Sequence, residues 1–417
     1  MKHLLLATLL LVAQLFCAVA QPQQLSTCSN PSEAFCPERL SLIDSVFQKI
    51  VDEQKLPQVV TLVAHRGEIV HHKAYGWRDM EQKIPCQRDD IFRIASQTKA
   101  IAAVALMTLW EEGKFQLDDP IKKYIPEFAN PVILEKYDRK TGTYTTRPTE
   151  KDITIRHLLT HTSGISYQGV HWDIAKRAGV PPLNSLDNVT LEQMVKRMAK
   201  LPLAHEPGEK FTYSMNIDVL GYLMEILTRK TIDVFLKERI FDPIGMTDTY
   251  FYLPQDKVER LVRLYEFPKN GTLRLSQNEL NQTFPYAGAQ TLHCTGAGLS
   301  GTISDYAHFC QMVLNGGTFN GKRIIGRKTL ELMQRNAVGN MRGEIGFGMA
   351  WDVFLPEFAH KSIISTGSMR WGGMFGTDYV IDPSEELIIL IYTNCMPNFN
   401  GIKHKDTMHN LVYGALR

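Results

Sequence analysis

The sequence predicts an α/β (α+β) fold in which one sheet, built from two distant parts of the chain, is flanked by helices. Runs of β-branched and other apolar residues near both ends, at 58–75 and 378–392, are typical of paired strands. The stretch between them is mainly helical with long polar loops, which indicates an inserted helical domain. The 417 residues are 44% hydrophobic and 22% charged, a globular composition that provides a large core.

The first 20 residues have the pattern of a secretory signal peptide. Lys2 precedes an apolar stretch that ends in the small-residue cleavage site Ala18-Val19-Ala20. An uncleaved membrane anchor is the alternative, which the polar residues after Ala20 disfavour. We therefore expect a secreted, extracellular protein with no membrane segment after signal removal, beginning with a cysteine-bearing leader at 21–37. The formal net charge of +2 gives no support for a nucleic-acid partner.

Secretion would allow the cysteines to form disulfides and three asparagines to be glycosylated. Removal of Cys17 with the signal leaves an even number of cysteines, which permits a disulfide framework whose pairing the sequence leaves open, and free buried thiols are the alternative. Asparagine glycosylation is expected at three Asn-x-Thr sequences. The cysteines are Cys28, Cys36, Cys86, Cys294, Cys310 and Cys395, and the asparagines are Asn188, Asn270 and Asn281.

Three elements are predicted before the insertion. Apolar residues at helical spacing in 39–53 predict a surface helix. Residues 58–64 and 69–75, joined by a turn at 65–68, predict a β-hairpin. Residues 96–113 are apolar nearly all round, which is typical of a buried helix.

The helical insertion is assigned to 118–284, with helices at 155–160, 191–199 and 218–228. Beyond it we expect helices at 304–314 and 329–336, and strands at 378–381 and 387–392 joined by a turn. The sheet part then comprises 38–117 and 285–417, and residues 38–417 together form one catalytic domain.

Candidate catalytic residues begin with Ser96 and Lys99, which form an S-x-x-K pattern at the start of the buried helix. Positions i and i+3 share a helix face, so the lysine amine can reach the serine hydroxyl. Free backbone N–H groups at a helix start favour the negative charge that develops in acyl transfer, although Ser96 could also be a simple N-cap. The chain has no H-E-x-x-H, C-x-x-C, G-x-x-x-x-G-K-[ST] or G-x-S-x-G motif, so we expect no metal and no cofactor.

Two further segments could contribute to a site. Tyr213, followed by Ser214, can act as a proton relay beside a cation, or can simply cap the core with its hydroxyl. Trp371-Gly372-Gly373 precedes a strand, and its glycines allow close approach of a ligand, or form a turn.

The order and spacing of these three motifs, with their flanks, resemble the serine β-lactamase and penicillin-recognising protein family. The resemblance is to class C-like esterases and covers residues 38–417. It implies a β-lactamase/transpeptidase-like fold, with a mainly antiparallel sheet flanked by helices and an inserted helical domain. It also implies that Ser96 is the acylated nucleophile, that Lys99 and Tyr213 share the acid and base work, and that the N–H groups of Ser96 and Met374 form an oxyanion hole.

Departures from the family pattern bear on the substrate. Trp371, Gly372 and Gly373 stand where β-lactamases usually carry Lys-Thr-Gly, and we assign them to substrate binding. Met215 replaces the asparagine that holds an acyl amide, and Asn216 comes one position late. Arg370 could replace the missing cation if it turned inward, but a solvated arginine is the expected state. His157 and His161 lie four residues apart without a third ligand, so we assign them structural roles.

The sequence therefore predicts a secreted serine hydrolase, a carboxylesterase or acyltransferase that acts on small esters through an acyl-enzyme on Ser96. One alternative is a β-lactamase or D-amino-acid peptidase, which would require Arg370 as carboxylate partner. The other is a non-catalytic secreted binding or matrix protein that retains the fold. The expected partner is a small ester or acyl substrate, and the sequence is silent on oligomeric state.

Overall fold

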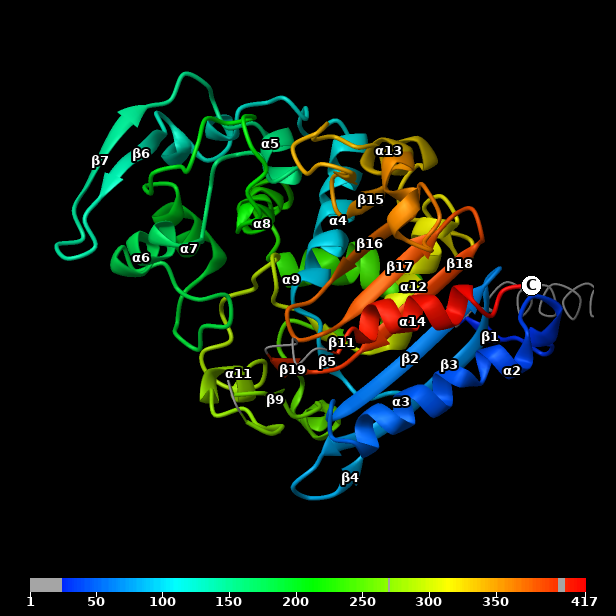
Figure 1. Cartoon of the computed structure of the whole chain (residues 1–417). Coiled ribbons are helices and arrows are strands. Elements are labelled where there is room, and N and C mark those ends of the chain that lie inside the picture. The colour runs from blue at the N-terminus through cyan, green and yellow to red at the C-terminus, as the bar shows by residue number, and fades with distance from the viewer. Residues whose placement is uncertain (1–24, 269–270, 397–401) are drawn as a thin grey trace, which may run out of the picture.

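The computed structural model describes residues 25–268, 271–396 and 402–417 (Figure 1). The predicted signal peptide, the first residues of the leader, Cys17 and the Asn270 glycosylation site lie outside the described residues. Among the helices that are described, none is long and apolar enough to cross a membrane.

A nine-stranded sheet joins the two ends of the chain, as the sequence predicts. The hairpin strands β2 (Gln58–His65) and β3 (Glu68–Asp79) pair with each other, and β2 also pairs with β18 (Leu387–Tyr392). The order is β1-β3-β2-β18-β17-β16-β15-β14, with β4 beside β3. Every pair is antiparallel except β1 with β3, which confirms a mainly antiparallel sheet. The other strands are β1 (Ser26–Thr27), β4 (Ile84–Pro85), β14 (Ile345–Phe347), β15 (Asp352–Phe354), β16 (Met369–Gly372) and β17 (Asp378–Asp382).

Helices cover both faces of this sheet (Figure 1). Helix α3 (Leu42–Asp52) and helix α14 (His404–Tyr413) pack on one face, and α12 (Ile303–Leu314) packs on the other together with α4 (Thr98–Glu111). Successive strand residues point to opposite faces of the sheet. Val59 and Val63 therefore pack in the core beneath α3 and α14, while Val60 and Leu62 pack in the core on the side of α4 and α12. The predicted surface helix is interrupted at Ser41, which separates α2 (Pro37–Leu40) from α3.

The segment between the two sheet parts is mainly helical and lies to one side of the sheet (Figure 1). It also contains an unpredicted hairpin, β6 (Val132–Tyr137) with β7 (Tyr144–Pro148). Most side chains of this hairpin are polar and exposed, so they lack the apolar alternation that marks a strand in sequence. The helices here are α5 (Ile155–Leu159), α6 (Val170–Arg177), α7 (Leu191–Met198), α8 (Asn216–Thr228), α9 (Ile232–Leu236), α10 (Asp242–Ile244) and α11 (Glu279–Thr283), with a π-helical turn at Lys237–Phe241.

Short elements complete the fold. Three-stranded sheets are formed by β5 (Phe92–Arg93), β11 (Ser300–Gly301) and β8 (Thr249–Tyr250), and by β10 (Arg274–Leu275), β9 (Tyr265–Glu266) and β19 (Cys395–Met396). A small hairpin joins β12 (Thr318–Phe319) to β13 (Lys322–Arg323), followed by helix α13 (Arg327–Met333). The 3₁₀ turns are Pro31–Glu33, Ala95–Gln97, Ile121–Lys123, Pro126–Phe128, Gln255–Arg260 and Pro356–Lys361.

The permitted disulfide framework is not formed in this structure. All six cysteines within the described segments are free thiols. Cys86, Cys294 and Cys310 are packed as apolar residues in the larger core and Cys395 in the smaller one, where burial raises the pKa of each thiol. Cys36, which is half-buried, contacts Oε2 of Glu38 through its Sγ at 3.1 Å.

Candidate active site

The serine of the S-x-x-K pattern lies on a tight turn between β5 and α4. Ala95 adopts a left-handed φ of 46°, which places Ser96 in a 3₁₀ turn directly before the helix. A left-handed alanine costs about 1 kcal/mol or more and needs support from its surroundings. Thr98 Oγ1 supplies part of it, because it donates to the Ala95 carbonyl at 2.6 Å and accepts the Leu299 N–H at 3.1 Å. The predicted buried helix therefore begins as an α-helix at Thr98, two residues after the serine.

Ser96 and Lys99 are in contact, as their spacing predicts. Lys99 Nζ lies 3.3 Å from Ser96 Oγ, and only 4% of the lysine is exposed. The amine also donates to the Gly296 carbonyl at 2.6 Å, so its position is fixed by backbone from a distant part of the chain. A buried amine beside the serine hydroxyl is the arrangement that removes a proton from a serine nucleophile.

Tyr213 lies over this pair. Its ring centroid is 4.5 Å from Lys99 Nζ, and the ring packs against Trp371 at 5.2 Å and His161 at 4.7 Å. The buried Tyr213 hydroxyl has no hydrogen-bond partner among the described residues. Because a buried hydroxyl is normally hydrogen-bonded, this one is available to a bound substrate.

Asp218 and Lys99 both form hydrogen bonds with the backbone of Gly296. Asp218 Oδ1 accepts the Gly296 N–H at 2.9 Å, and the carbonyl of the same glycine accepts from Lys99. Burial raises the pKa of Asp218 to about 6, although the nearby Lys99 charge opposes this shift. The sequence marked 218 only as the start of a helix, and the helix in fact begins at Asn216.

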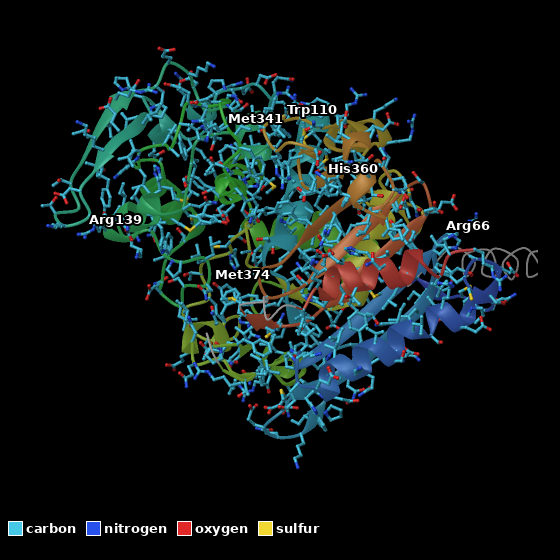
Figure 2. All side chains as sticks on the ribbon, in the orientation of Figure 1. Arg66, Trp110, Arg139, Met341, His360 and Met374 are labelled. Carbon is cyan, nitrogen blue, oxygen red and sulfur yellow. The ribbon has the colours of Figure 1, made fainter. Side chains whose placement is uncertain are left out.

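The two N–H groups expected to form an oxyanion hole are free. Neither Ser96 nor Met374 donates its N–H to a backbone carbonyl within the described chain. Gly373 allows the two segments to approach, since a Cβ there would lie 2.4 Å from the Ile94 carbonyl oxygen and 2.4 Å from Thr377 Oγ1. Met374 lies on the side of the sheet that faces the helical insertion (Figure 2), with its side chain 56% exposed.

A cavity of about 800 Å³ contains these groups. Its volume is that of a small-molecule site, and most of its wall is apolar or aromatic. Ser96, Lys99 and Tyr213 line it together with Trp371, Gly372 and Gly373, so all the residues predicted to act on substrate meet in one place. The apolar wall comes from Tyr167, Trp172, Pro182, Leu183, Met215, Phe284 and Phe375.

The structure shows where the residues that depart from the family pattern lie, Met215 with Asn216 and Arg370 beside Trp371. Met215 faces the cavity, whereas the Asn216 amide is buried away from it and bonds Ser163 Oγ at 2.5 Å and His161 Nδ1 at 2.8 Å. Arg370, expected to be solvated, instead lines the cavity wall, and its Nε lies 3.2 Å from the Asp378 carboxylate. The expectation for Arg370 is wrong because Asp378 provides a counterion that the sequence does not reveal. The Asp378 side chain is buried, with 3% of it exposed.

His157 and His161 have the structural positions expected of them. His157 Nδ1 accepts the Thr154 N–H at 3.2 Å and so caps α5. His161 lies within an aromatic cluster beside Tyr213, where burial, followed by the Lys99 charge, holds its pKa well below the usual value. His161 thereby supports the site from outside the cavity wall.

The remaining site predictions concern modification and metal. Asn188 is exposed, whereas Asn281 is half-buried in the cavity wall, with its Oδ1 accepting from Asn184 Nδ2 at 2.6 Å. In the portion of the chain that the structure describes, no three His, Cys, Asp or Glu side chains are grouped as metal ligands would be.

Comparisons with known proteins agree with this geometry. The β-lactamase family model matches residues 43–412. Protein Rv1367c of Mycobacterium tuberculosis H37Rv is 31% identical over 368 residues, which are 85% of this chain and 89% of the relative. Esterase EstB of Burkholderia gladioli is 27% identical over 372 residues, covering 84% and 89%. The solved structure of EstCE1, described as a hydrolase with promiscuous acyltransferase activity, superposes with a TM-score of 0.74 at 26% identity, over 90% of this chain and 99% of that one.

Proposed function

Because the chain belongs to the β-lactamase family of serine hydrolases, we propose that it cleaves small carboxylic esters through an acyl-enzyme on Ser96. The observation that carries this proposal is the buried Lys99 amine, which lies 3.3 Å from the Ser96 hydroxyl in the wall of the cavity. Similarity to EstB and EstCE1 supports ester and acyl chemistry.

Acylation follows from the positions of the side chains. Lys99, in its neutral form, accepts the Ser96 proton as Oγ bonds to the ester carbonyl carbon. The carbonyl oxygen becomes an oxyanion, and the N–H groups of Ser96 and Met374, which donate to no backbone carbonyl in the described chain, bind it in this proposal. The C–O bond to the alcohol then breaks. Tyr213, whose hydroxyl has no partner in the described structure, donates its proton to the departing alkoxide and takes up the proton that Lys99 received from Ser96, so both side chains return to their starting forms.

Deacylation reverses these roles. Water, or the hydroxyl of an acceptor alcohol, attacks the acyl-enzyme carbonyl while Tyr213 takes its proton and passes it to Lys99. The C–O bond to Ser96 Oγ then breaks, Lys99 returns the proton to Ser96, and the acid or the new ester leaves. The first nucleophile makes the enzyme an esterase, and the second makes it an acyltransferase.

The cavity wall favours esters over β-lactams. Met215 presents an apolar surface where an amide-bearing substrate would need a polar partner, and the Asn216 amide is committed to Ser163 and His161. Trp371 adds a further apolar surface beside Tyr213. The apolar wall is therefore suited to an acyl chain or an alkyl alcohol.

The test uses the full chain expressed in a eukaryotic cell and collected from the medium, because we also propose that it is secreted after cleavage at Ala20. Intact mass is measured with and without a fluorophosphonate probe, beside Ser96→Ala and Lys99→Ala, and hydrolysis of 4-nitrophenyl butyrate is followed in parallel. We expect a mature chain that begins at Gln21, one probe per molecule, and loss of labelling in both variants.

Penicillin G and a D-Ala-D-Ala peptide provide the comparison. Acylation by penicillin at a rate similar to that of the ester would support a β-lactamase or peptidase instead. A wild-type protein that neither labels nor hydrolyses the ester would leave only a binding protein with this fold.

A further inference from the structure

A second, smaller cavity lies beside the catalytic one, inside the helical insertion. This inner cavity has a volume of about 20 Å³, which is room for roughly one water-sized or methyl-sized group. One polar side chain in its wall is Ser166, whose Oγ accepts the Gln168 N–H at 3.1 Å. Apolar side chains from helices α6 and α7 and from the segments beside them form most of the wall, at Ile165, Ala175, Val180, Met198, Leu201 and Leu203.

Two side chains, Tyr167 and Met215, line both the inner cavity and the catalytic cavity, so they form the partition between them. The Tyr167 ring packs edge-to-face on the Tyr213 ring, with the centroids 6.3 Å apart. Met215 is buried, but its side chain is unbranched and has several rotatable bonds. Met215 is therefore the part of the partition that can move without disturbing Tyr213.

This partition lies close to the reacting groups. Tyr213 precedes Met215 by two residues, and its ring centroid is 4.5 Å from Lys99 Nζ. The Met215 backbone is held at the start of helix α8, because its carbonyl accepts the Asp218 N–H at 3.2 Å. An apolar cavity stays dry and takes up apolar groups, so the inner cavity is suited to the end of an alkyl chain that enters from the catalytic side.

We propose that the inner cavity is a subsite for the end of an unbranched alkyl chain and that Met215 moves aside to admit it. This inference rests on the proposed esterase function and refines its substrate class to esters with a medium-length chain. The chain end lies beside Ala175 and Met198 in the bound state. Each methylene that leaves water for an apolar site improves binding about three- to fourfold. The chain belongs to the acyl group or to the alcohol, and the experiment distinguishes the two.

Two pairs of esters that differ only in chain length test the proposal. The chain is on the acyl side in methyl octanoate, with methyl butanoate as its short partner. It is on the alcohol side in heptyl acetate, with propyl acetate as its short partner. The two long esters are isomers, so they differ only in which side carries the chain. We expect kcat/KM to favour the long ester about tenfold or more in at least one pair, and a preference in neither pair would overturn the subsite.

Ala175→Leu fills the inner cavity from helix α6, at a position that does not line the catalytic cavity. It should lower kcat/KM for the preferred long ester about tenfold, the effect of roughly two methylenes, and should change the short ester less than about twofold. The matched control is Ala178→Leu, because Ala178 lies at the end of the same helix, is exposed and lines neither cavity.

A second filling variant guards against a failure to fold. Met198→Phe fills the same cavity from helix α7 and should reproduce the selective loss on the long ester. An equal loss on long and short esters in both filling variants, or the same effect from Ala178→Leu, would overturn the subsite.

Met215→Ala removes the movable part of the partition. It should raise the ratio of kcat/KM for the long ester over the short ester about threefold or more, because the chain no longer has to displace the methionine. Adding Ala175→Leu to this variant should cancel the gain. A ratio that stays raised in the double variant would place the chain elsewhere in the catalytic cavity and reject the inner cavity as its site.

A binding measurement separates this proposal from the proposed function. Calorimetry with methyl octanoate and with heptyl acetate compares Ser96→Ala with the double variant Ser96→Ala, Ala175→Leu. Binding of either ester that weakens about tenfold in the double variant supports the subsite even if the wild type shows no turnover. Unchanged binding of both esters would reject the subsite while leaving the esterase intact.

Discussion

Lys99 contacts backbone and side chains from three separate parts of the chain. Ser96 lies one helical turn before it, Gly296 accepts its hydrogen bond from the far side of the insertion, and the Tyr213 ring covers it. Asp218 makes no hydrogen bond to Lys99 itself. It accepts the N–H of Gly296, the residue whose carbonyl accepts from Lys99. The second oxygen, Asp218 Oδ2, has no hydrogen-bond partner among the described residues. Its charge is therefore weakly compensated and acts on Lys99 through space.

The Asp218→Asn variant removes one negative charge beside Lys99 and keeps the shape of the side chain. The amide oxygen can still accept the Gly296 N–H, but the variant loses the negative charge that stabilises the positive charge developing on neutral Lys99 as it accepts the Ser96 proton. Because the pKa of Asp218 is raised to about 6, wild-type kcat/KM should fall as the pH drops through 6, and the variant should lack this step. At pH 8 we expect the variant to be about 10- to 100-fold slower.

Asp305→Asn provides the matched control for this pH profile. Burial also raises the pKa of Asp305 to about 6, but its carboxylate binds the Asp248 N–H and Thr249 Oγ1 rather than the site. Its variant should keep the wild-type acid limb. A step near pH 6 that persists in Asp218→Asn would assign that step to another group.

At the scale of elements, Arg93 holds strand β5 and the nucleophile turn against the 262–284 segment. Its guanidinium is fully buried and donates to three backbone carbonyls: Val262 at 2.9 Å, Gln282 at 2.7 Å and Phe284 at 2.8 Å. Burial lowers the pKa of Arg93 to about 9, so it stays charged at neutral pH. Only a planar group with several N–H donors can satisfy all three carbonyls.

Arg93→Lys should therefore destabilise the protein although it preserves the charge. A lysine cannot reach three diverging carbonyls, so at least one is left buried without a donor, and we expect about 3 kcal/mol less free energy of unfolding in urea. Arg66→Lys is the control, because Arg66 is 72% exposed and pairs with exposed Glu386; its effect should be within about 0.5 kcal/mol. Equal unfolding curves for the two variants would contradict this role of Arg93.

The elements that the sequence predicts well are those with strong local patterns. The 58–75 hairpin and the strands at 378–392 are confirmed. Strands β2, β17 and β18 consist largely of β-branched and other apolar residues that are buried on both faces, whereas β3 is partly exposed. The contact of Ser96 with Lys99 follows from helical spacing alone. Asp218 and Arg93 could not be assigned, because their partners lie far away in sequence and only tertiary packing brings them together. The hairpin of β6 and β7 was missed for the opposite reason, since exposed polar strands carry little local signal.

At the scale of the whole molecule, the sheet depends on pairing between its first and last long strands. Val60 in β2 pairs with Tyr392 in β18, so the sheet is complete only when both ends of the chain are present. Helix α14 packs on the face formed by this pairing. Both sheet parts and the helical insertion line the catalytic cavity, so the site depends on the whole folded chain.

Buried histidines make the stability of this unit depend on pH. Burial is the first cause of a lowered pKa in ten histidines, and the pKa of His71 and of His72 falls to about 4 in each case. A histidine with a lowered folded pKa contributes stability above its unfolded pKa of about 6.5, and that contribution is lost as the pH falls toward the folded value. The ten are His65, His71, His72, His157, His161, His171, His293, His308, His404 and His409.

Five buried or half-buried carboxyls act in the opposite direction. Burial raises the pKa of Asp218 and of Asp305 to about 6, that of Glu225 to about 7, and also that of Asp90 and of Asp352. Their contributions are present at low pH and are lost as the pH rises through the raised pKa values. They are outnumbered by the histidines. We expect the free energy of unfolding in urea to fall by about 3–5 kcal/mol from pH 7 to pH 5.

His71→Gln identifies one source of this fall. His71 Nε2 lies 2.8 Å from Thr61 Oγ1, and a glutamine amide can keep that hydrogen bond without taking up a proton. The loss of stability between pH 7 and pH 5 should be smaller in this variant by about 1–2 kcal/mol, the linkage expected for one histidine whose folded pKa is near 4. His360→Gln, at an exposed position (Figure 2), should leave the slope unchanged. If both variants keep the wild-type slope, the acid sensitivity arises from the carboxylates with lowered pKa, such as Asp378, whose effect begins at lower pH.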